Sequence, residues 1–407
     1  MNFFLEIKEG LIIAFRAIRA NKMRATLTTL GIVIGVVSVT LMATGIEGVD
    51  RSFQKSTAAF GTNVLYVQKF PWVGGEDFWK YRNRRDMEVR HAEALERQST
   101  LLEAVAPVAS TTRPAKYKDK TFETAFLSGT TWSYFAASGT TIDQGRFFSQ
   151  EESNGGRPVC VVGANIVETL FPNEDPIGKV IKVGGYPYRV LGTFEKQGGF
   201  FGIFTSDNRI LVPYESFASR FGSRRDVSIN VRVASSVDVE DAKEEIRGIL
   251  RKARGLLPGQ EDDFSINQQE ILLQAFGQVT GVIAAVGLFI TGLALFVGGI
   301  GIMNIMFVSV TERTKEIGIR KAIGAKRRTI LLQFLIESAA ICLIGGIIGL
   351  MIAWPLSLIV DQFLPTAMPL SVVGIAILVS LMVGVISGFM PAYRASRLDP
   401  VDALRYE

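Results

Sequence analysis

Four long hydrophobic runs interrupt an otherwise mixed chain of 407 residues, and together they contain a single charged residue, Glu337. The runs are Ala25–Ile46, Phe276–Val310, Ile330–Val360 and Leu370–Met390. A hydrocarbon core of about 30 Å needs roughly 20 apolar residues in a helix, so each run predicts a transmembrane span. The first run is longer than a usual signal-peptide core and continues in helical register, so we expect it to remain uncleaved. The second is longer than a bilayer requires, so part of it should project beyond the lipid, as a stalk, or tilt within it.

Between the first and second runs the pattern changes to short β-rich segments bounded by Gly, Pro or Asn, which is typical of a folded domain. The predicted strands are Asn63–Gln68, Arg157–Val162, Lys179–Val183, Tyr188–Phe194, Arg209–Pro213 and Val227–Val233. Gly184-Gly185 predicts a tight hairpin turn, and Asp238–Ala253 has helical spacing with one apolar face. The fold class is therefore a membrane protein with four transmembrane helices and an α+β domain inserted between helices 1 and 2.

Two further parts of this domain have a marked composition. Arg84–Arg97 is a highly charged helical candidate, and His91 within it, the only histidine of the chain, is expected on a solvated face. The segments Phe70–Arg85 and Phe194–Phe204 are aromatic, glycine-containing loops. Each loop could anchor at the membrane interface or contact a partner, and local packing is an equally good explanation.

Lysine and arginine near the span ends predict the topology, because cytoplasmic loops retain these residues. Basic residues are concentrated before the first span, between the second and third spans, and after the fourth; the loop 361–369 has none. Both termini and the 311–329 segment are therefore expected in the cytoplasm and residues 47–275 outside. The outer segment carries 29 basic and 30 acidic residues, so the net charge of +5 reflects orientation and does not predict nucleic-acid binding.

The chain lacks the motifs of the common catalytic sites. Gly178-Lys179 is followed by Val180, and Asn173 stands where a phosphate-binding loop requires glycine, so no nucleotide site of that kind is expected. Cys160 and Cys342 fall in different compartments and predict no disulfide, and a single histidine excludes multi-histidine metal sites. We therefore expect no catalytic residues, no metal site and no cofactor in this chain, and no enzymatic activity.

The cytoplasmic segment 311–329 is charged and amphipathic, and on physical grounds it could simply lie on anionic lipid. Its sequence, with Glu312-Arg313, Glu316 to Arg320, Ala322 to Ala325 and the later Glu337-Ser338, resembles the signature of the MacB and FtsX-like permease superfamily. That resemblance implies a coupling helix that docks on an ATPase. The residues it assigns to coupling are Glu312, Arg313, Glu316, Ile317, Ile319, Arg320, Lys321, Ala322, Gly324 and Ala325.

Other regions are similar to the same family, so the resemblance covers nearly the whole chain. They include the first span around Leu30-Gly31-Ile32, the closing motif from Pro391 to Arg405, and Asp175-Pro176-Ile177-Gly178-Lys179 in the outer domain. The expected divisions are a cytoplasmic amphipathic helix (1–20), span 1 with stalk (21–60), a MacB-type periplasmic domain (61–266) with porter-like flanks and an inserted subdomain (about 109–220), stalk with span 2 (267–310), coupling helix (311–329), span 3 (330–360), outer loop (361–369), span 4 (370–393) and cytoplasmic tail (394–407).

The resemblance also implies a function and partners. MacB carries an ATPase ahead of its first span, whereas this sequence begins almost at the membrane, so we expect a separate nucleotide-binding subunit that holds ATP and magnesium. Two permease copies in the bacterial inner membrane would drive efflux by mechanotransmission, with a periplasmic adaptor and a TolC-like outer-membrane channel. The alternatives are a lipoprotein-release permease, an FtsX-like regulator of a periplasmic cell-wall hydrolase, and a scaffold without an ATPase.

Two features within the spans complete the prediction. Glycine pairs at four-residue spacing, such as Gly31 and Gly35, let helix backbones approach closely, either within one chain or at a dimer seam. The resemblance favours spans 1 and 2 for the seam, where the small residues are Gly31, Gly35, Gly298, Gly299 and Gly301. Glu337 lies inside the third span, where a charge is costly unless paired, so we expect an arginine partner from the cytoplasmic loop.

Overall fold

A computed structural model describes residues 22–58, 61, 63–74, 78–197, 199–200, 204–223, 225–362, 366 and 368–405. It divides the chain into two compact units, which we call the membrane unit (Met1–Ser52 with Gln278–Glu407) and the outer unit (Phe53–Gly277). The predicted amphipathic helix over 1–20 lies outside the described residues.

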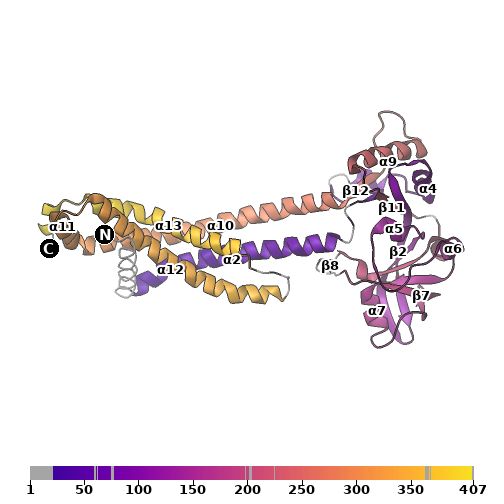
Figure 1. The fold of residues 1–407 in the computed structure, drawn as a ribbon, viewed down its shortest axis with the longest axis horizontal. Coiled ribbons are helices and arrows are strands. Elements are labelled where there is room, and N and C mark those ends of the chain that lie inside the picture. The colour runs from indigo at the N-terminus through magenta and orange to yellow at the C-terminus, as the bar shows by residue number, and fades with distance from the viewer. Residues whose placement is uncertain are drawn as a thin grey trace. The chain divides into compact units, whose positions relative to one another are not determined.

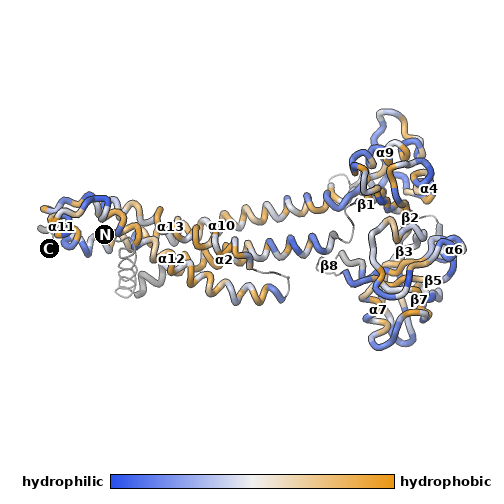
Figure 2. Tube along the Cα trace, viewed as in Figure 1, coloured by the Kyte–Doolittle hydropathy of each residue, from blue (hydrophilic) through white to orange (hydrophobic). Residues whose placement is uncertain are grey.

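Four long helices carry the predicted spans, as Figure 1 shows: α2 Lys22–Ala58, α10 Gln269–Glu312, α12 Arg327–Asp361 and α13 Leu370–Arg397. All four are long and apolar enough to cross a membrane, and Figure 2 shows hydrophobic residues concentrated along them. At 1.5 Å per residue, the 44 residues of α10 extend about 66 Å, roughly twice the hydrocarbon thickness. The prediction of four membrane helices is confirmed.

Small residues set the spacing of the helices in the membrane unit. A Cβ atom added to Gly384 of α13 would lie 2.8 Å from the Ala339 Cα atom of α12, so these two helices touch backbone to backbone. Around these close contacts, larger side chains form a continuous buried cluster that includes Ile32, Ile302 and Phe334. Lipid offers apolar groups as readily as protein does, so close packing of this kind holds helices together in a bilayer.

The outer unit is built on one ten-stranded mixed sheet in the order β12-β1-β11-β2-β3-β10-β5-β7-β4, with β6 paired to β2 and β7. Its strands are β1 Val64–Gln68, β2 Leu102–Tyr117, β3 Lys120–Thr130, β4 Ile142–Gly145, β5 Val159–Val162, β6 Val180–Val183, β7 Tyr186–Phe194, β10 Arg209–Pro213, β11 Val227–Val233 and β12 Ser265–Gln268. A separate two-stranded sheet consists of β8 Gly199–Phe200 and β9 Phe204–Thr205.

Helices surround this sheet and complete the α+β fold predicted from the sequence. They are α3 Phe78–Arg82, α4 Val89–Gln98, α5 Tyr134–Ser138, α6 Gln150–Asn154, α7 Ala164–Leu170, α8 Tyr214–Phe221, α9 Val239–Ala253 and the 3₁₀ turn η1 Ser206–Asn208. In α9 the apolar face predicted from spacing is buried at Ala242, Ile246 and Leu250, and the Asp238 carboxylate caps its first turn. The division into flanks and an inserted subdomain stays a prediction.

Six strands were predicted and all six occur, with small differences at their ends. The hairpin between β6 and β7 turns at Gly184 and Gly185, whose φ values of 57° and 90° favour glycine. The two longest strands, β2 and β3, were missed. Pro107 and Pro114 in β2 are unfavourable in strands, and their cost is offset by pairing with β3, β11 and β6.

The two aromatic loops differ in how they pack. In the 70–85 segment, the Trp72 ring lies 4.9 Å from the Tyr66 ring, and the Trp72 backbone N–H donates to Asn267 Oδ1. Trp79 of α3 is instead 72% exposed. Local packing therefore accounts for Trp72, whereas Trp79 stays largely exposed, with the Arg82 guanidinium 5.6 Å from its ring centre. In the 194–204 segment the structure describes the β8–β9 pairing, and residues 198 and 201–203 lie outside it.

The prediction of a solvated His91 was wrong. Helix α4 begins at Val89 rather than near Arg84, and His91 is 2% exposed. Its Nδ1 atom accepts a hydrogen bond from the Glu88 backbone N–H, which forms a capping box at the start of the helix. The surrounding charges predicted an exposed face. His91 is instead the third residue of α4, and its hydrogen bond in the capping box holds the side chain in a buried position.

Burial, followed by the charge of nearby Arg254, lowers the pKa of His91 to about 4. An unfolded histidine titrates near 6.5, so the unfolded state binds a proton first as pH falls. The stability that His91 contributes is therefore complete above about pH 6.5 and is lost toward pH 4. We expect His91→Gln, which keeps a capping acceptor, to reduce the fall in melting temperature between pH 6.5 and 5. An unchanged pH dependence in that variant would contradict this assignment.

Candidate functional site

The segment between the second and third spans forms a short helix with a defined break on each side. Helix α10 ends at Glu312, and α11 covers Thr314–Ala322. Arg313 between them has φ −105° and ψ 16°, outside the helical range, so the chain bends there. The helix therefore occupies the central part of the predicted 311–329 segment, and α12 starts already at Arg327.

Gly324 ends α11 in a geometry that favours glycine. Its φ is +101°, its backbone N–H donates to Lys321 O at 3.0 Å, and the Ala325 N–H donates to Arg320 O at 3.0 Å. These two bonds are the Schellman pattern, which satisfies carbonyls that the helix end would leave unpaired. The Gly324-Ala325 pair of the sequence motif thus fixes where α11 stops and where the chain turns toward α12.

The side chains of α11 divide between the interior of the chain and its surface. Ile317 is buried in the hydrophobic cluster of the membrane unit, so its side chain packs within this chain and is not exposed to a partner. Ile319 is 45% exposed, and Ile323, directly after the helix, is 82% exposed. Glu312, Glu316, Ala322 and Gly324 are also exposed, while Arg313, Arg320, Lys321 and Ala325 are half-buried. The surface of the segment therefore combines aliphatic and charged groups.

Arg320 has hydrogen-bond partners on both α11 and α12. Arg320 donates from Nη2 to Glu316 Oε1 at 2.5 Å and from Nη1 to Gln333 Oε1 at 2.8 Å. An exposed pair one helical turn apart contributes only about 0.3–0.5 kcal/mol, but the second bond reaches from α11 to α12. Arg320 therefore also links α11 to α12.

Glu337 has the arginine partner that the sequence predicted. Its side chain is almost fully buried in α12, and both carboxylate oxygens lie 3.3 Å from Arg313 Nη1. Arg313 is the residue at the bend between α10 and α11, so the ion pair holds that bend against α12. Lys321 turns away from the surface and donates to the Leu398 carbonyl oxygen at the end of α13.

The glycines predicted for helix packing make contacts within the chain. A Cβ atom on Gly31 would lie 2.9 Å from Gly298 Cα, and one on Gly35 would lie 2.5 Å from Leu295 Cδ2. Gly299 faces Ser387 of α13 in the same way, and Gly301 is half-buried in α10. Packing of α2 on α10 within one chain thus explains Gly31, Gly35 and Gly298. A dimer seam on these helices stays a prediction.

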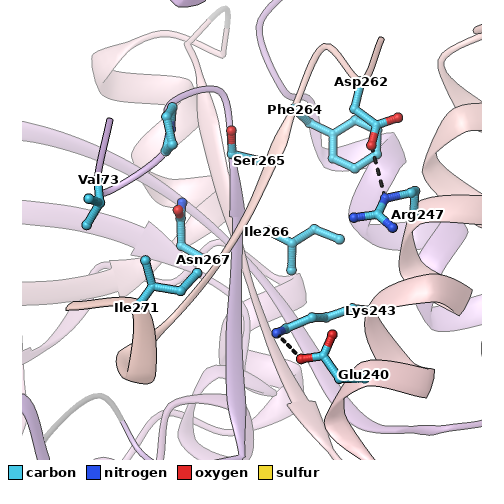
Figure 3. A pocket seen from close by; sticks show the side chains of 11 residues that line it. Val73, Glu240, Lys243, Arg247, Asp262, Phe264, Ser265, Ile266, Asn267 and Ile271 are labelled. Atoms are coloured by element: carbon cyan, nitrogen blue, oxygen red, sulfur yellow. Dashed lines mark hydrogen bonds and ion pairs between the residues drawn. The ribbon is translucent and has the colours of Figure 1, made fainter. Parts of the chain in front are cut away.

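A groove of about 380 Å³ in the outer unit adjoins β12, the strand that leads directly into α10. Figure 3 shows Asn267 and Ile266 on opposite sides of this strand, with Lys243 and Arg247 approaching from α9. The charges are paired among themselves, since Lys243 Nζ lies 2.5 Å from Glu240 Oε1 and Arg247 bonds the Asp262 carboxylate. Among the described residues, no cluster of His, Cys, Asp or Glu could hold a metal ion.

Residues 25–249 match the family model described as MacB-like periplasmic core domain, and residues 288–400 match the one described as FtsX-like permease C-terminal. The first match alone covers more than half of the chain. The chain therefore belongs to the MacB/FtsX-like family of ABC transporter permeases, and it is a multi-pass membrane protein with a periplasmic domain of MacB type.

Individual relatives agree with this class. The chain is 35% identical over 413 residues to the macrolide export ATP-binding/permease protein MacB of Escherichia coli strain K12, and 34% identical over 406 residues to that of Bdellovibrio bacteriovorus. These alignments include 100% and 99% of this chain and 62% of each relative, so the chain spans about 62% of their length. The ATPase region of the relatives is not covered.

Solved structures of outer domains are also similar to part of the chain. The periplasmic region of MacB from Actinobacillus actinomycetemcomitans is 22% identical, with a TM-score of 0.45, over 53% of this chain and 94% of that chain. The extracellular domain of the noncanonic ABC-type transporter YknZ from Gram-positive bacteria is 18% identical, with a TM-score of 0.41, over 50% of this chain and 99% of that chain.

Proposed function

We propose that this chain is the permease subunit of an ABC transporter in which α11 and the turn after it dock on a separate nucleotide-binding subunit. The observation that carries the proposal is the presentation of Ile319 and Ile323, aliphatic and exposed, on a segment closed by Gly324. Binding of a partner that covers these side chains would be favoured by about 25 cal/mol for each Å² of apolar surface removed from water. ATP and magnesium would be bound by that partner.

The path of motion follows from the continuity of α10. One uninterrupted helix joins β12 of the outer unit to the bend at Arg313, so a displacement of α11 can reach the outer unit along it. The Arg313–Glu337 pair would make α12 follow the same displacement. We propose efflux by this mechanotransmission, with substrate handled by the periplasmic domain and without a transmembrane pore.

The assembly we propose is a homodimer in a bacterial inner membrane, with both termini and α11 in the cytoplasm. A periplasmic adaptor and a TolC-like outer-membrane channel would complete it. The support is the 33–35% identity of this chain to proteins named as macrolide exporters, over 98–100% of its length. Copurification separates the alternatives, because an ATPase with an adaptor supports efflux and an ATPase with a cell-wall hydrolase supports regulation.

Gly324→Val should abolish copurification of the ATPase with this chain and uncouple ATP hydrolysis from transport. A β-branched residue is strained at φ +101°, so the turn that places Ile323 would rearrange. The measurement is the amount of ATPase retained by tagged chain from the native membrane, together with export of the substrate.

Gly259→Val is the matched control, since Gly259 has φ +84° with open space around it but lies in the outer unit. It should strain the backbone equally and leave the ATPase bound. Full retention of ATPase and export by Gly324→Val would refute the proposed docking site.

A further inference from the structure

The short helix α14, Pro400–Arg405, packs against α11. The contact begins at Leu398, the C-terminal cap of α13, whose carbonyl oxygen accepts a 2.6 Å hydrogen bond from Lys321 Nζ. Asp399 then caps α14 by accepting from the Val401 backbone N–H at 2.9 Å. Lys321 thus supplies a donor to a carbonyl that the end of α13 leaves without a helical partner.

The environment of Lys321 agrees with a fixed position. The side chain is half-buried, and this burial, followed by the charge of Arg327, lowers its pKa, while Asp399 acts in the opposite direction. Lys315 on the same helix is exposed. The two lysines of α11 therefore have different surroundings, although the sequence offers no way to separate them.

Four elements meet beside this hydrogen bond. A cavity of about 310 Å³ is lined by Phe307 of α10, Thr314 of α11, Arg394 of α13 and Asp402 of α14, among others. Ala403 of α14 is buried, and the Arg394 guanidinium lies 5.9 Å from the Phe307 ring centre. Helix α14 thus lines the same cavity as α10, α11 and α13.

We propose that α11 and α14 form one coupling unit, in which Lys321 is a positioning residue that fixes α11 to the end of α13. This inference rests on the proposed function. Its consequence is that an ATPase acting on α11 displaces α13 directly, in addition to α10 and α12, and that the C-terminal residues belong to the transmission machinery. Lys321 itself would make no contact with the ATPase.

Lys321→Met tests the proposal in the full-length chain reconstituted in lipid, because methionine keeps the apolar stem and removes the donor. Amide hydrogen exchange in residues 399–405 should rise at least tenfold, while exchange in the outer unit stays unchanged. Lys321→Arg, which retains a donor, should restore most of the protection. Lys315→Met is the control and should leave exchange in this region as in the wild type.

The second measurement uses the ATPase that copurifies with the wild-type chain. Lys321→Met should retain that ATPase while export for each ATP hydrolysed falls several-fold. If the variant instead loses the ATPase as Gly324→Val does, Lys321 is a contact residue and the positioning role is overturned. Unchanged exchange in 399–405 would also overturn this inference alone. Failure of any ATPase to copurify with the wild type would overturn the proposed function while the exchange result stands.

Discussion

Glu337→Ala is expected to destabilise the membrane unit by about 3 kcal/mol, the lower end of the range for breaking a buried ion pair from one side. The Glu337 side chain is 2% exposed, and Arg313 would keep its charge there without a counterion. We choose the lower end because the Arg313 side chain is 27% exposed and retains some water. The midpoint of detergent-induced unfolding, followed in the full-length chain, measures the effect.

Two controls make this result specific. Glu316→Ala removes a carboxylate from an exposed pair with Arg320 and should cost less than about 1 kcal/mol. Replacing both Arg313 and Glu337 by methionine should recover much of the lost stability, because neither charge then remains unpaired. An equal loss in Glu337→Ala and Glu316→Ala would show that the buried pair has no special role.

Gly31→Val should have the second large effect, a loss of about 1–3 kcal/mol from overpacking between α2 and α10. The new Cβ atom would lie 2.9 Å from the Gly298 Cα atom, which is backbone and cannot rotate away. The helices must therefore separate along this contact. The unfolding midpoint and the oligomeric state in lipid nanodiscs should be measured together.

Gly45→Val is the control for this substitution, since Gly45 lies in the same helix and a Cβ atom there meets nothing within 4 Å. It should leave the midpoint near the wild-type value. Loss of a dimer by Gly31→Val with an unchanged midpoint would contradict packing within the chain and would place Gly31 at a seam between two copies.

The membrane helices were predictable because a bilayer imposes a minimum apolar length, and four runs met it without competing patterns. The strands of the outer unit were predicted where β-branched residues are frequent, as in β11, and the longest two were missed where such residues are sparser. In β2, Pro107 and Ala109 have low strand propensity, and the strand forms because the distant strand β11 and the next strand β3 pair with it.

The 311–329 segment shows the same limit at the level of single residues. The sequence motif identified Gly324, because a helix-ending glycine is a local requirement. It could not separate Ile317, which the membrane unit buries, from Ile319, which stays exposed, although they lie two residues apart. The prediction of a solvated His91 failed for a related reason, because its capping bond to the Glu88 N–H depends on where the helix begins.

The pairing of β1 with β12 has a consequence for how the chain is made. In this pairing Leu65 lies opposite Gln268, about 200 positions later in the chain. β12 is the edge strand of the sheet, and it covers the side of β1 that faces away from β11. Until the ribosome has delivered residue 268, β1 lacks this neighbour and exposes a strand edge that can pair wrongly. The outer unit therefore cannot finish folding during early translocation, and we expect it to depend on periplasmic chaperones until the second span is inserted.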